Sequence, residues 1–128
     1  MNANVALFYL NRGKLKTEKN DFKGAMADYD NAINLNRRYL EAYNSRGILK
    51  KVQGDLNAAI SDFNKAVELD SNYYKAYINR GLAKAAKNDL YGAMADYNIV
   101  IKLNPSLSIP FLNRGIIKAR LRDALAAC

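Results

Sequence analysis

The sequence contains no histidine, no tryptophan and a single cysteine, Cys128, which is its last residue. These absences exclude the usual transition-metal sites and the histidine-dependent catalytic triads, and one cysteine cannot form a disulfide framework. The apolar stretch at 5–10 is far shorter than the roughly 20 residues of a membrane helix, and basic residues follow it rather than precede it as in a signal peptide. We therefore expect a cytoplasmic protein with no cofactor and no membrane contact, and we assign Cys128 no native role.

The composition is that of a folded, basic domain. Half of the 128 residues are hydrophobic and a quarter are charged, which provides enough apolar surface for a core. The 20 basic and 12 acidic side chains give a net charge of +8. This balance favours acidic partners but carries no information about the fold. The length fits one domain, 1–128.

A 34-residue spacing organises the whole chain. Four arginine–glycine pairs follow it, each preceded by asparagine or serine: Asn11-Arg12-Gly13, Ser45-Arg46-Gly47, Asn79-Arg80-Gly81 and Asn113-Arg114-Gly115. An aromatic residue lies four positions before each glycine, a lysine three positions after it and an aspartate eight positions after it. The spacing divides the chain into repeats at 6–39, 40–73 and 74–107 and a partial repeat at 108–128.

Each repeat is predicted to contain two helices. In the first repeat, apolar residues after the aspartate recur at i, i+3, i+4 and i+7, the spacing of one helix face. The aspartate suits the N-cap of the second helix, and the residue before it mostly tolerates the left-handed conformation that ends the first helix. The four turns are Asn20-Asp21, Gly54-Asp55, Asn88-Asp89 and Arg122-Asp123. The final segment is therefore predicted to hold one helix and the start of another.

The recurring glycines need a packing reason, because glycine inside a helix costs about 0.8–1.0 kcal/mol relative to alanine. We expect the first helix of each repeat to approach the second closely at the glycine, opposite a small residue. The small residues at the matching positions are Ala25, Ala59 and Ala93.

These markers resemble those of the tetratricopeptide repeat family, whose unit is a 34-residue helix–turn–helix with an aromatic, Leu-Gly, a tyrosine, an alanine, a second aromatic and a proline. In this sequence arginine replaces the leucine, lysine replaces the tyrosine, and only Pro105 keeps the terminal proline. The resemblance covers nearly the whole chain. It implies an all-α fold, a right-handed α-solenoid of antiparallel helix pairs, that acts as a non-catalytic protein–protein interaction scaffold.

The resemblance also implies a concave groove that binds a peptide segment or a partner helix. The asparagine or serine two positions before each glycine would face this groove and grip a peptide backbone, because an amide both donates and accepts hydrogen bonds. Around this ladder the groove becomes more apolar toward the C-terminus. The predicted peptide-binding residues are Asn11, Lys14, Asn44, Ser45, Ile48, Lys75, Ile78, Asn79, Leu82, Leu112, Asn113 and Ile116.

Members of the family that bind chaperone tails hold a terminal carboxylate with two lysines, two asparagines and an arginine at fixed positions. At those positions this chain has Leu10, Lys14, Ser45, Lys75 and Asn79. Only Lys75 fits, so the resemblance does not extend to a chaperone-tail clamp.

Two groups of recurring charged residues have alternative interpretations. The arginine–aspartate pairs, 16 positions apart, are Arg12 with Asp28, Arg46 with Asp62 and Arg80 with Asp96. Recurrence in every repeat favours an ion pair between the two helices over a site for acidic ligands. The lysines at 16, 50, 84 and 118 lie one turn beyond the arginines. They form either a solvated or inter-repeat face, or a basic strip for acidic peptide or nucleic acid.

The final segment carries an apolar face, whereas repeat arrays normally end in a polar capping helix. The chain is therefore either a piece of a longer array or a homo-oligomer that associates through 108–128. The predicted self-association residues are Ile109, Phe111, Ile117, Leu121 and Leu125.

The sequence contains no phosphate-binding glycine loop and no catalytic constellation, which indicates that the protein is not an enzyme. Our first hypothesis is a scaffold that binds a protein or peptide. The alternative is a basic helical-repeat module that binds nucleic acid. Against it, repeat two carries a net charge of −1, whereas repeats one and three and the final segment each carry +3, so no basic stripe is continuous. A structural array without a specific ligand is the third possibility.

Overall fold

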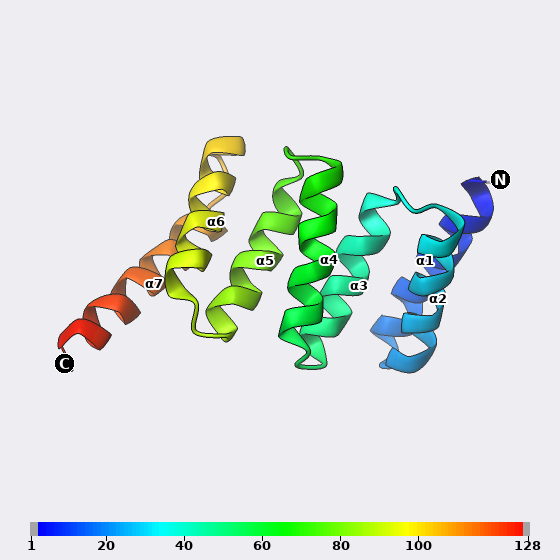
Figure 1. Cartoon of the computed structure of the whole chain (residues 1–128), viewed down its shortest axis with the longest axis horizontal. Coiled ribbons are helices and arrows are strands. Elements are labelled where there is room, and N and C mark those ends of the chain that lie inside the picture. Colours follow the sequence, from blue (N-terminus) through cyan, green and yellow to red (C-terminus); the bar gives the residue numbers. More distant parts are fainter. Residues whose placement is uncertain (1–2, 127–128) are drawn as a thin grey trace.

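The structure, a computed structural model, describes residues 3–126, so Cys128 lies outside the described part. Seven helices and no strand occupy these residues, and the helices follow one another along the long axis of the molecule (Figure 1). They are α1 (Ala3–Glu18), α2 (Phe22–Leu35), α3 (Leu40–Val52), α4 (Leu56–Leu69), α5 (Tyr74–Ala86), α6 (Leu90–Leu103) and α7 (Ile109–Ala126). Each helix packs against the next, most closely within the pairs α1–α2, α3–α4 and α5–α6. The predicted all-α solenoid of helix pairs is confirmed.

The turn inside each pair is the one that the sequence predicts. Asp21 caps α2 by accepting a hydrogen bond from the Gly24 backbone N–H at 3.0 Å, and Asp55 and Asp89 cap α4 and α6 in the same way. The residues before these caps have positive φ: 63° at Asn20, 84° at Gly54 and 69° at Asn88. Asparagine and glycine are the residues that adopt this conformation most easily. Two adjacent residues thus end one helix and start the next.

Tyrosines fix the loops between repeats. The Tyr43 hydroxyl donates to the Arg37 carbonyl at 2.9 Å, and the Tyr77 hydroxyl donates to the Ser71 carbonyl at 3.1 Å. Both tyrosines are buried. In repeats two and three the aromatic residue four positions before the glycine therefore closes the loop that precedes its own helix.

The helical glycines contact aromatic rings, not alanines. A Cβ added at Gly13 would lie 2.6 Å from a ring atom of the second helix, and one added at Gly47 or Gly81 would lie 2.5 Å from one. The rings belong to Tyr29, Phe63 and Tyr97. The expectation that the glycines face Ala25, Ala59 and Ala93 is wrong, because the aromatic one turn beyond each alanine fills the space.

The final segment forms one helix that continues through Asp123, so the prediction that Asp123 starts a second helix is wrong. In the other turns the residue before the aspartate is asparagine or glycine with positive φ, whereas Arg122 precedes Asp123. Arginine disfavours that conformation, so the helix does not end. α7 packs on α6 through Ile117 and Leu121 and projects past it at the C-terminal end (Figure 1).

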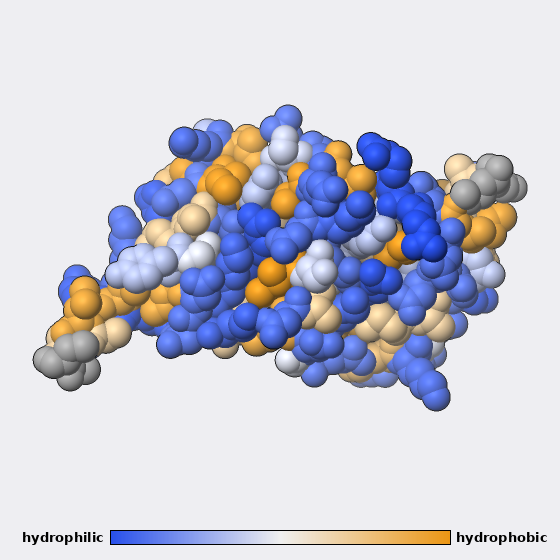
Figure 2. All heavy atoms as spheres, viewed as in Figure 1, coloured by the Kyte–Doolittle hydropathy of each residue, from blue (hydrophilic) through white to orange (hydrophobic). Residues whose placement is uncertain are grey.

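The surface is uneven in hydropathy. Figure 2 shows mostly hydrophilic residues over the middle of this face and hydrophobic residues near its two ends, including the end that α7 forms. Four apolar residues of α7 are at least half exposed: Ile109, Leu112, Ile116 and Leu125. None of the seven described helices is both long and apolar enough to span a bilayer.

The glycine contacts predict opposite effects of alanine at two equivalent positions. Gly81→Ala places a Cβ 2.5 Å from the buried Tyr97 ring, so we expect the free energy of unfolding to fall by about 1–3 kcal/mol, the usual cost of overpacking. Gly115→Ala meets nothing within 4 Å and should raise it by about 0.8–1.0 kcal/mol. Thermal unfolding followed by circular dichroism measures both, and equal melting temperatures would contradict the packing reason for the glycines.

Candidate functional site

Each helix pair buries one aspartate of its second helix, and these residues are 2% exposed at Asp28, 4% at Asp62 and 1% at Asp96. The arginine 16 positions earlier binds the carboxylate through Nε and Nη2. The distances are 2.9 and 2.8 Å in the first two repeats and 3.0 and 2.7 Å in the third. This bidentate geometry satisfies both oxygens and gives a strong ion pair. The predicted ion pair between the two helices of each repeat is confirmed.

The recurring lysines bind the same carboxylates. Their Nζ atoms lie 3.1 Å from Asp28 for Lys16, 3.1 Å from Asp62 for Lys50 and 3.3 Å from Asp96 for Lys84. In the three complete repeats each lysine pairs within its own repeat, so the expectation of pairing between repeats is wrong, and the basic strip stays a prediction. The cause is the buried aspartate, which lies within reach of a side chain one turn beyond the arginine.

The ion pairs of this cluster shift the pKa values of their members. The hydrogen bond from Arg12 holds the pKa of Asp28 below its ordinary value of 3.8, with burial opposing the shift and Lys16 adding to it. The hydrogen bond to Asp62 likewise raises the pKa of Arg46. Among the described residues, no group of acidic side chains is arranged to hold a metal ion. These ion pairs stabilise the fold, and only their aspartates are buried.

The arginines also connect neighbouring repeats. Arg46 donates through Nη1 to Asp30 of α2 at 2.9 Å, and Arg80 donates to Asn64 of α4 at 2.9 Å. Each guanidinium also lies over the aromatic ring one turn earlier in its helix, at 5.7 Å for Arg46 and 5.2 Å for Arg80. One arginine therefore contacts three consecutive helices.

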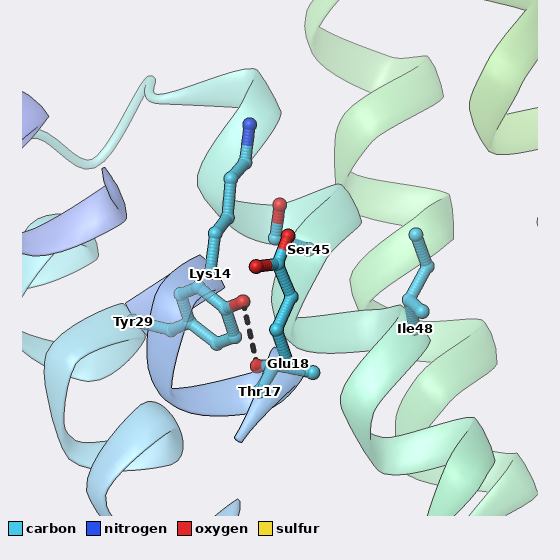
Figure 3. Close-up of a pocket in the computed structure, with 6 residues that line it drawn as sticks. All are labelled: Lys14, Thr17, Glu18, Tyr29, Ser45 and Ile48. Atoms are coloured by element: carbon cyan, nitrogen blue, oxygen red, sulfur yellow. Dashed lines mark hydrogen bonds between the residues drawn. The ribbon is translucent and has the colours of Figure 1, made fainter. Parts of the chain in front are cut away.

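A pocket of about 260 Å³ lies between α1, α2 and α3 (Figure 3). Its lining residues are Lys14, Thr17, Glu18, Tyr29, Ser45 and Ile48. Three of them, Lys14, Ser45 and Ile48, are predicted peptide-binding residues, and the structure brings them together. The pocket therefore lies beside predicted peptide-binding residues of α1 and α3.

The pocket combines a hydroxyl pair with charged side chains, and the Lys14 Nζ lies 4.0 Å from Oε2 of Glu41. The Thr17 hydroxyl donates to the Gly13 carbonyl at 2.9 Å, so the Tyr29 hydroxyl is the donor in its 3.0 Å hydrogen bond to Thr17. Burial raises the pKa of Tyr29, which keeps this hydroxyl protonated. Figure 3 shows the Lys14 and Glu18 side chains extending from α1 beside Ser45 of α3. A cation, an anion and a hydroxyl around a small cavity can bind a backbone amide together with a polar side chain.

A second polar group joins α3 and α5. Asn79 donates through Nδ2 to Oδ1 of Asn44 at 3.1 Å, and Asn44 is buried. Asn44 is therefore a support for Asn79, and the prediction that it contacts a peptide is wrong because the folded chain covers it. Within residues 3–126, Oδ1 and the second N–H of Asn79 remain available to a ligand.

The other predicted peptide-binding residues lie on the same helices outside the pocket. Exposed residues are Asn11, Lys75, Leu82, Leu112 and Ile116, and half-buried residues are Ile78 and Asn113. α1 contacts α3, and α3 contacts α5. We call the predicted peptide-binding residues of α1, α3, α5 and α7, apart from the buried Asn44, the first-helix face.

Three pocket residues were not predicted from the sequence: Thr17, Glu18 and Tyr29. A difference between the repeats in the sequence could have indicated Thr17 and Tyr29. A buried tyrosine hydroxyl needs a hydrogen-bond partner, and only the first repeat has a threonine one turn after the glycine, where the next two have Lys51 and Ala85.

The predicted self-association residues divide into two groups. Exposed ones are Ile109 at 57%, Phe111 at 42% and Leu125 at 69%. Ile117 is only 2% exposed and packs with Leu121 against α6. The prediction that Ile117 contacts a second copy is wrong, because the second position after the glycine packs on the preceding helix of the same chain. Leu121 is only half-buried, so its part in self-association stays a prediction.

Comparison with family models gives one family. A model described as tetratricopeptide repeat matches residues 6–39 and 74–107, and a model described as TPR repeat matches residues 50–88. The first two ranges coincide with repeats one and three of the 34-residue spacing. A search of curated protein sequences found no match.

Solved structures share this fold over nearly the whole chain. The first TPR domain of human RPAP3 is 24% identical, with a TM-score of 0.92 over 99% of this chain and 100% of that chain. The first TPR of Spaghetti (RPAP3) bound to the HSP90 peptide SRMEEVD is 24% identical, with a TM-score of 0.91 over 95% and 97%. The TPR2B domain of yeast Sti1 in complex with pHsp70 is 21% identical, with a TM-score of 0.84 over 90% and 97%. At this identity the likeness establishes the fold alone.

The low pKa of Asp28 predicts acid sensitivity. Since its folded-state pKa lies below the ordinary 3.8, the ionised side chain stabilises the fold above about pH 4, and this stabilisation is lost as the pH falls through the folded-state pKa. Asp28→Asn should lower the free energy of unfolding by about 1.5–3 kcal/mol at pH 7, the range for hydrogen bonds to charged groups. It should also reduce the loss of stability that the unchanged chain shows below about pH 4. Melting temperatures from pH 7 to 2 measure this. Glu68→Gln, whose side chain is 72% exposed, is the control, and equal losses in both variants would contradict the prediction.

Proposed function

Since this chain belongs to the tetratricopeptide repeat family, we propose that it is a non-catalytic interaction module that binds a peptide segment of another protein on its first-helix face. The pocket between α1, α2 and α3 is the observation that carries the proposal, because it gathers three residues that the sequence had marked for peptide binding. The cytoplasmic location remains a prediction.

The chemistry of the face indicates the kind of peptide. Near the N-terminal end, Lys14 and Ser45 suit a polar segment with an acidic side chain, and Asn79 can bind a backbone amide. Toward the C-terminal end, the positions equivalent to Lys14 are Ile48, Leu82 and Ile116, which suit apolar side chains. A peptide with an acidic group at one end and apolar residues at the other fits this gradient.

Two of the structural neighbours are solved with chaperone peptides, an HSP90 peptide on Spaghetti and pHsp70 on Sti1. They support a peptide as the class of ligand. This chain has only Lys75 at the positions that the family uses to clamp a chaperone tail, so we propose a ligand of different sequence.

The pairing of the recurring arginines and lysines with buried aspartates argues against the nucleic-acid alternative. In the three complete repeats the recurring arginines and lysines bind buried aspartates, so part of their charge is neutralised within the chain and less of it is available to phosphates.

We further propose that the Asn-Arg-Gly or Ser-Arg-Gly motif marks a variant of the repeat. The arginine takes the place of the family's leucine, and in this fold it binds the buried aspartate of the second helix. The lysine that replaces the family's tyrosine binds the same carboxylate. We therefore propose that arginine in place of leucine, lysine in place of tyrosine and the buried aspartate occur together as one set.

Peptide selection from a random phage-displayed library tests the function. We expect enriched peptides with an acidic residue followed by apolar residues, and we expect Leu82→Glu to weaken a selected peptide by about tenfold or more, because it charges an apolar contact. Tyr91→Glu, at a 71% exposed position of α6 outside the first-helix face, is the matched control. No enrichment, or equal loss in both variants, would reject the proposal. Binding of single-stranded RNA with a steep salt dependence would favour the alternative.

Self-association through α7 remains a prediction, now limited to Ile109, Phe111, Leu121 and Leu125. We expect sedimentation velocity at tens of micromolar, a usual concentration for weak association, to show a dimer that Phe111→Glu removes. Val52→Glu, which charges a 59% exposed residue of α3, should leave it unchanged. A monomer at all these concentrations would remove the prediction.

A further inference from the structure

The pocket between α1, α2 and α3 differs in chemistry from the same place in the other repeats. Lys51 and Phe63 occupy the positions of Thr17 and Tyr29 in repeat two, and alanine replaces the threonine in repeat three. Only the first repeat therefore places two hydroxyl groups together at this point. Since α1 and α2 form repeat one and α3 begins repeat two, helices of two complete repeats surround the pocket.

The hydrogen bonds of the two pocket hydroxyls run in one direction. Thr17 uses its only hydroxyl proton on the Gly13 carbonyl at 2.9 Å, and Tyr29 uses its proton on Thr17 at 3.0 Å. Because burial raises the pKa of Tyr29, this hydroxyl keeps its proton at neutral pH. The Tyr29 oxygen has a further lone pair that forms no hydrogen bond within residues 3–126. Toward a ligand, the Tyr29 oxygen can therefore only accept.

Glu18 is the charged lining residue that lacks an opposite charge. The Nζ atom of Lys14, one turn earlier in α1, lies 4.0 Å from Oε2 of Glu41 on α3. Glu18 has no cationic partner in the part of the chain that the structure describes. Figure 3 shows the Glu18 side chain extending toward Ser45, with the Lys14 ammonium away from the two hydrogen-bonded hydroxyls. The polar side of the pocket therefore offers oxygen acceptors and a negative charge.

We propose that this pocket binds the side chain of an arginine in the partner peptide, an inference that rests on the proposed function. A guanidinium has five N–H donors in one rigid plane and no acceptor, so it can bind the Glu18 carboxylate and the Tyr29 oxygen together. Ile48 lines the same pocket and can contact the methylene groups of the arginine. A ligand carboxylate would lie beside Glu18 and an oxygen that cannot donate, so the pocket discriminates against it.

The arginine complements the acidic side chain that Lys14 suits. Lys14 and Glu18 are four positions apart on α1, so they lie one turn apart on the same helix face. A peptide with an acidic residue beside its arginine can therefore pair with both. A lysine is a poorer match for the pocket, because a compact ammonium lacks the planar fork that binds separate acceptors at once.

The probe is the tightest-binding peptide that the phage-displayed library yields on the unchanged chain. We expect it to contain an arginine close to its acidic residue. The peptide is synthesised with a fluorophore in two forms, one with arginine and one with citrulline, which has nearly the same shape but no charge. By fluorescence anisotropy with the full chain, the citrulline form should bind about tenfold or more weakly, because it loses charge-assisted hydrogen bonds.

Variants of the chain locate the arginine. Glu18→Gln should weaken the arginine form by about tenfold or more and change the citrulline form by less than about twofold, because only the charged form loses an ionic partner. Its melting temperature should equal that of the unchanged chain, since Glu18 has no cationic partner within residues 3–126. Tyr29→Phe removes the accepting oxygen and should weaken the arginine form by about threefold or more. Glu68→Gln on α4 is the matched control and should alter neither form.

Two results would overturn the arginine pocket and leave the proposed function standing. One is enrichment of peptides that contain no arginine. The other is equal weakening of the arginine and citrulline forms by Glu18→Gln, which would place the arginine elsewhere on the chain. A selection that enriches no peptide would reject the proposed function and this inference with it.

Discussion

The buried aspartate of each second helix is the constraint on which this fold depends. A carboxylate removed from water is costly unless both oxygens are paired, and here an arginine and a lysine of the first helix pair them. This requirement sets the register between the two helices, and the ring after the aspartate then demands a glycine beside the arginine. The arginine, glycine, lysine, aspartate and aromatic residue are parts of one contact, which is why they recur together at a fixed spacing.

The sequence predicts those features that a single short contact determines. The caps at Asp21, Asp55 and Asp89 need only a carboxylate and a preceding residue that accepts positive φ. Two neighbouring residues in the sequence are enough to identify both. The arginine–aspartate pair was predictable because three copies keep the same separation. Within the candidate site, Lys14 and Ile48 were found because their place on a first helix follows from the repeat spacing alone.

The features that the sequence did not predict depend on which neighbour fills a space. A lysine at the helical spacing of Lys16 is compatible with solvent or with an ion pair, and only the depth of Asp28 decides between them. The glycine contact was assigned to alanine because register shows which turns meet but not which side chain of a turn reaches across. Asn44 was misplaced for the same reason, since its burial comes from the neighbouring α5. At Asp123 the cap was present but the preceding residue could not end the helix.

The arginines that contact three consecutive helices give the array a direction. Arg46 and Arg80 each donate through one nitrogen to the preceding helix and through two nitrogens to the following helix. The two ends of the solenoid are therefore chemically different. At the leading edge Arg12 binds forward to Asp28, and at the trailing edge Arg114 binds backward to Asn98. The array is therefore directional: Arg46 and Arg80 point the same way along the chain, and their contacts with the preceding and the following helix use different nitrogens and cannot be exchanged.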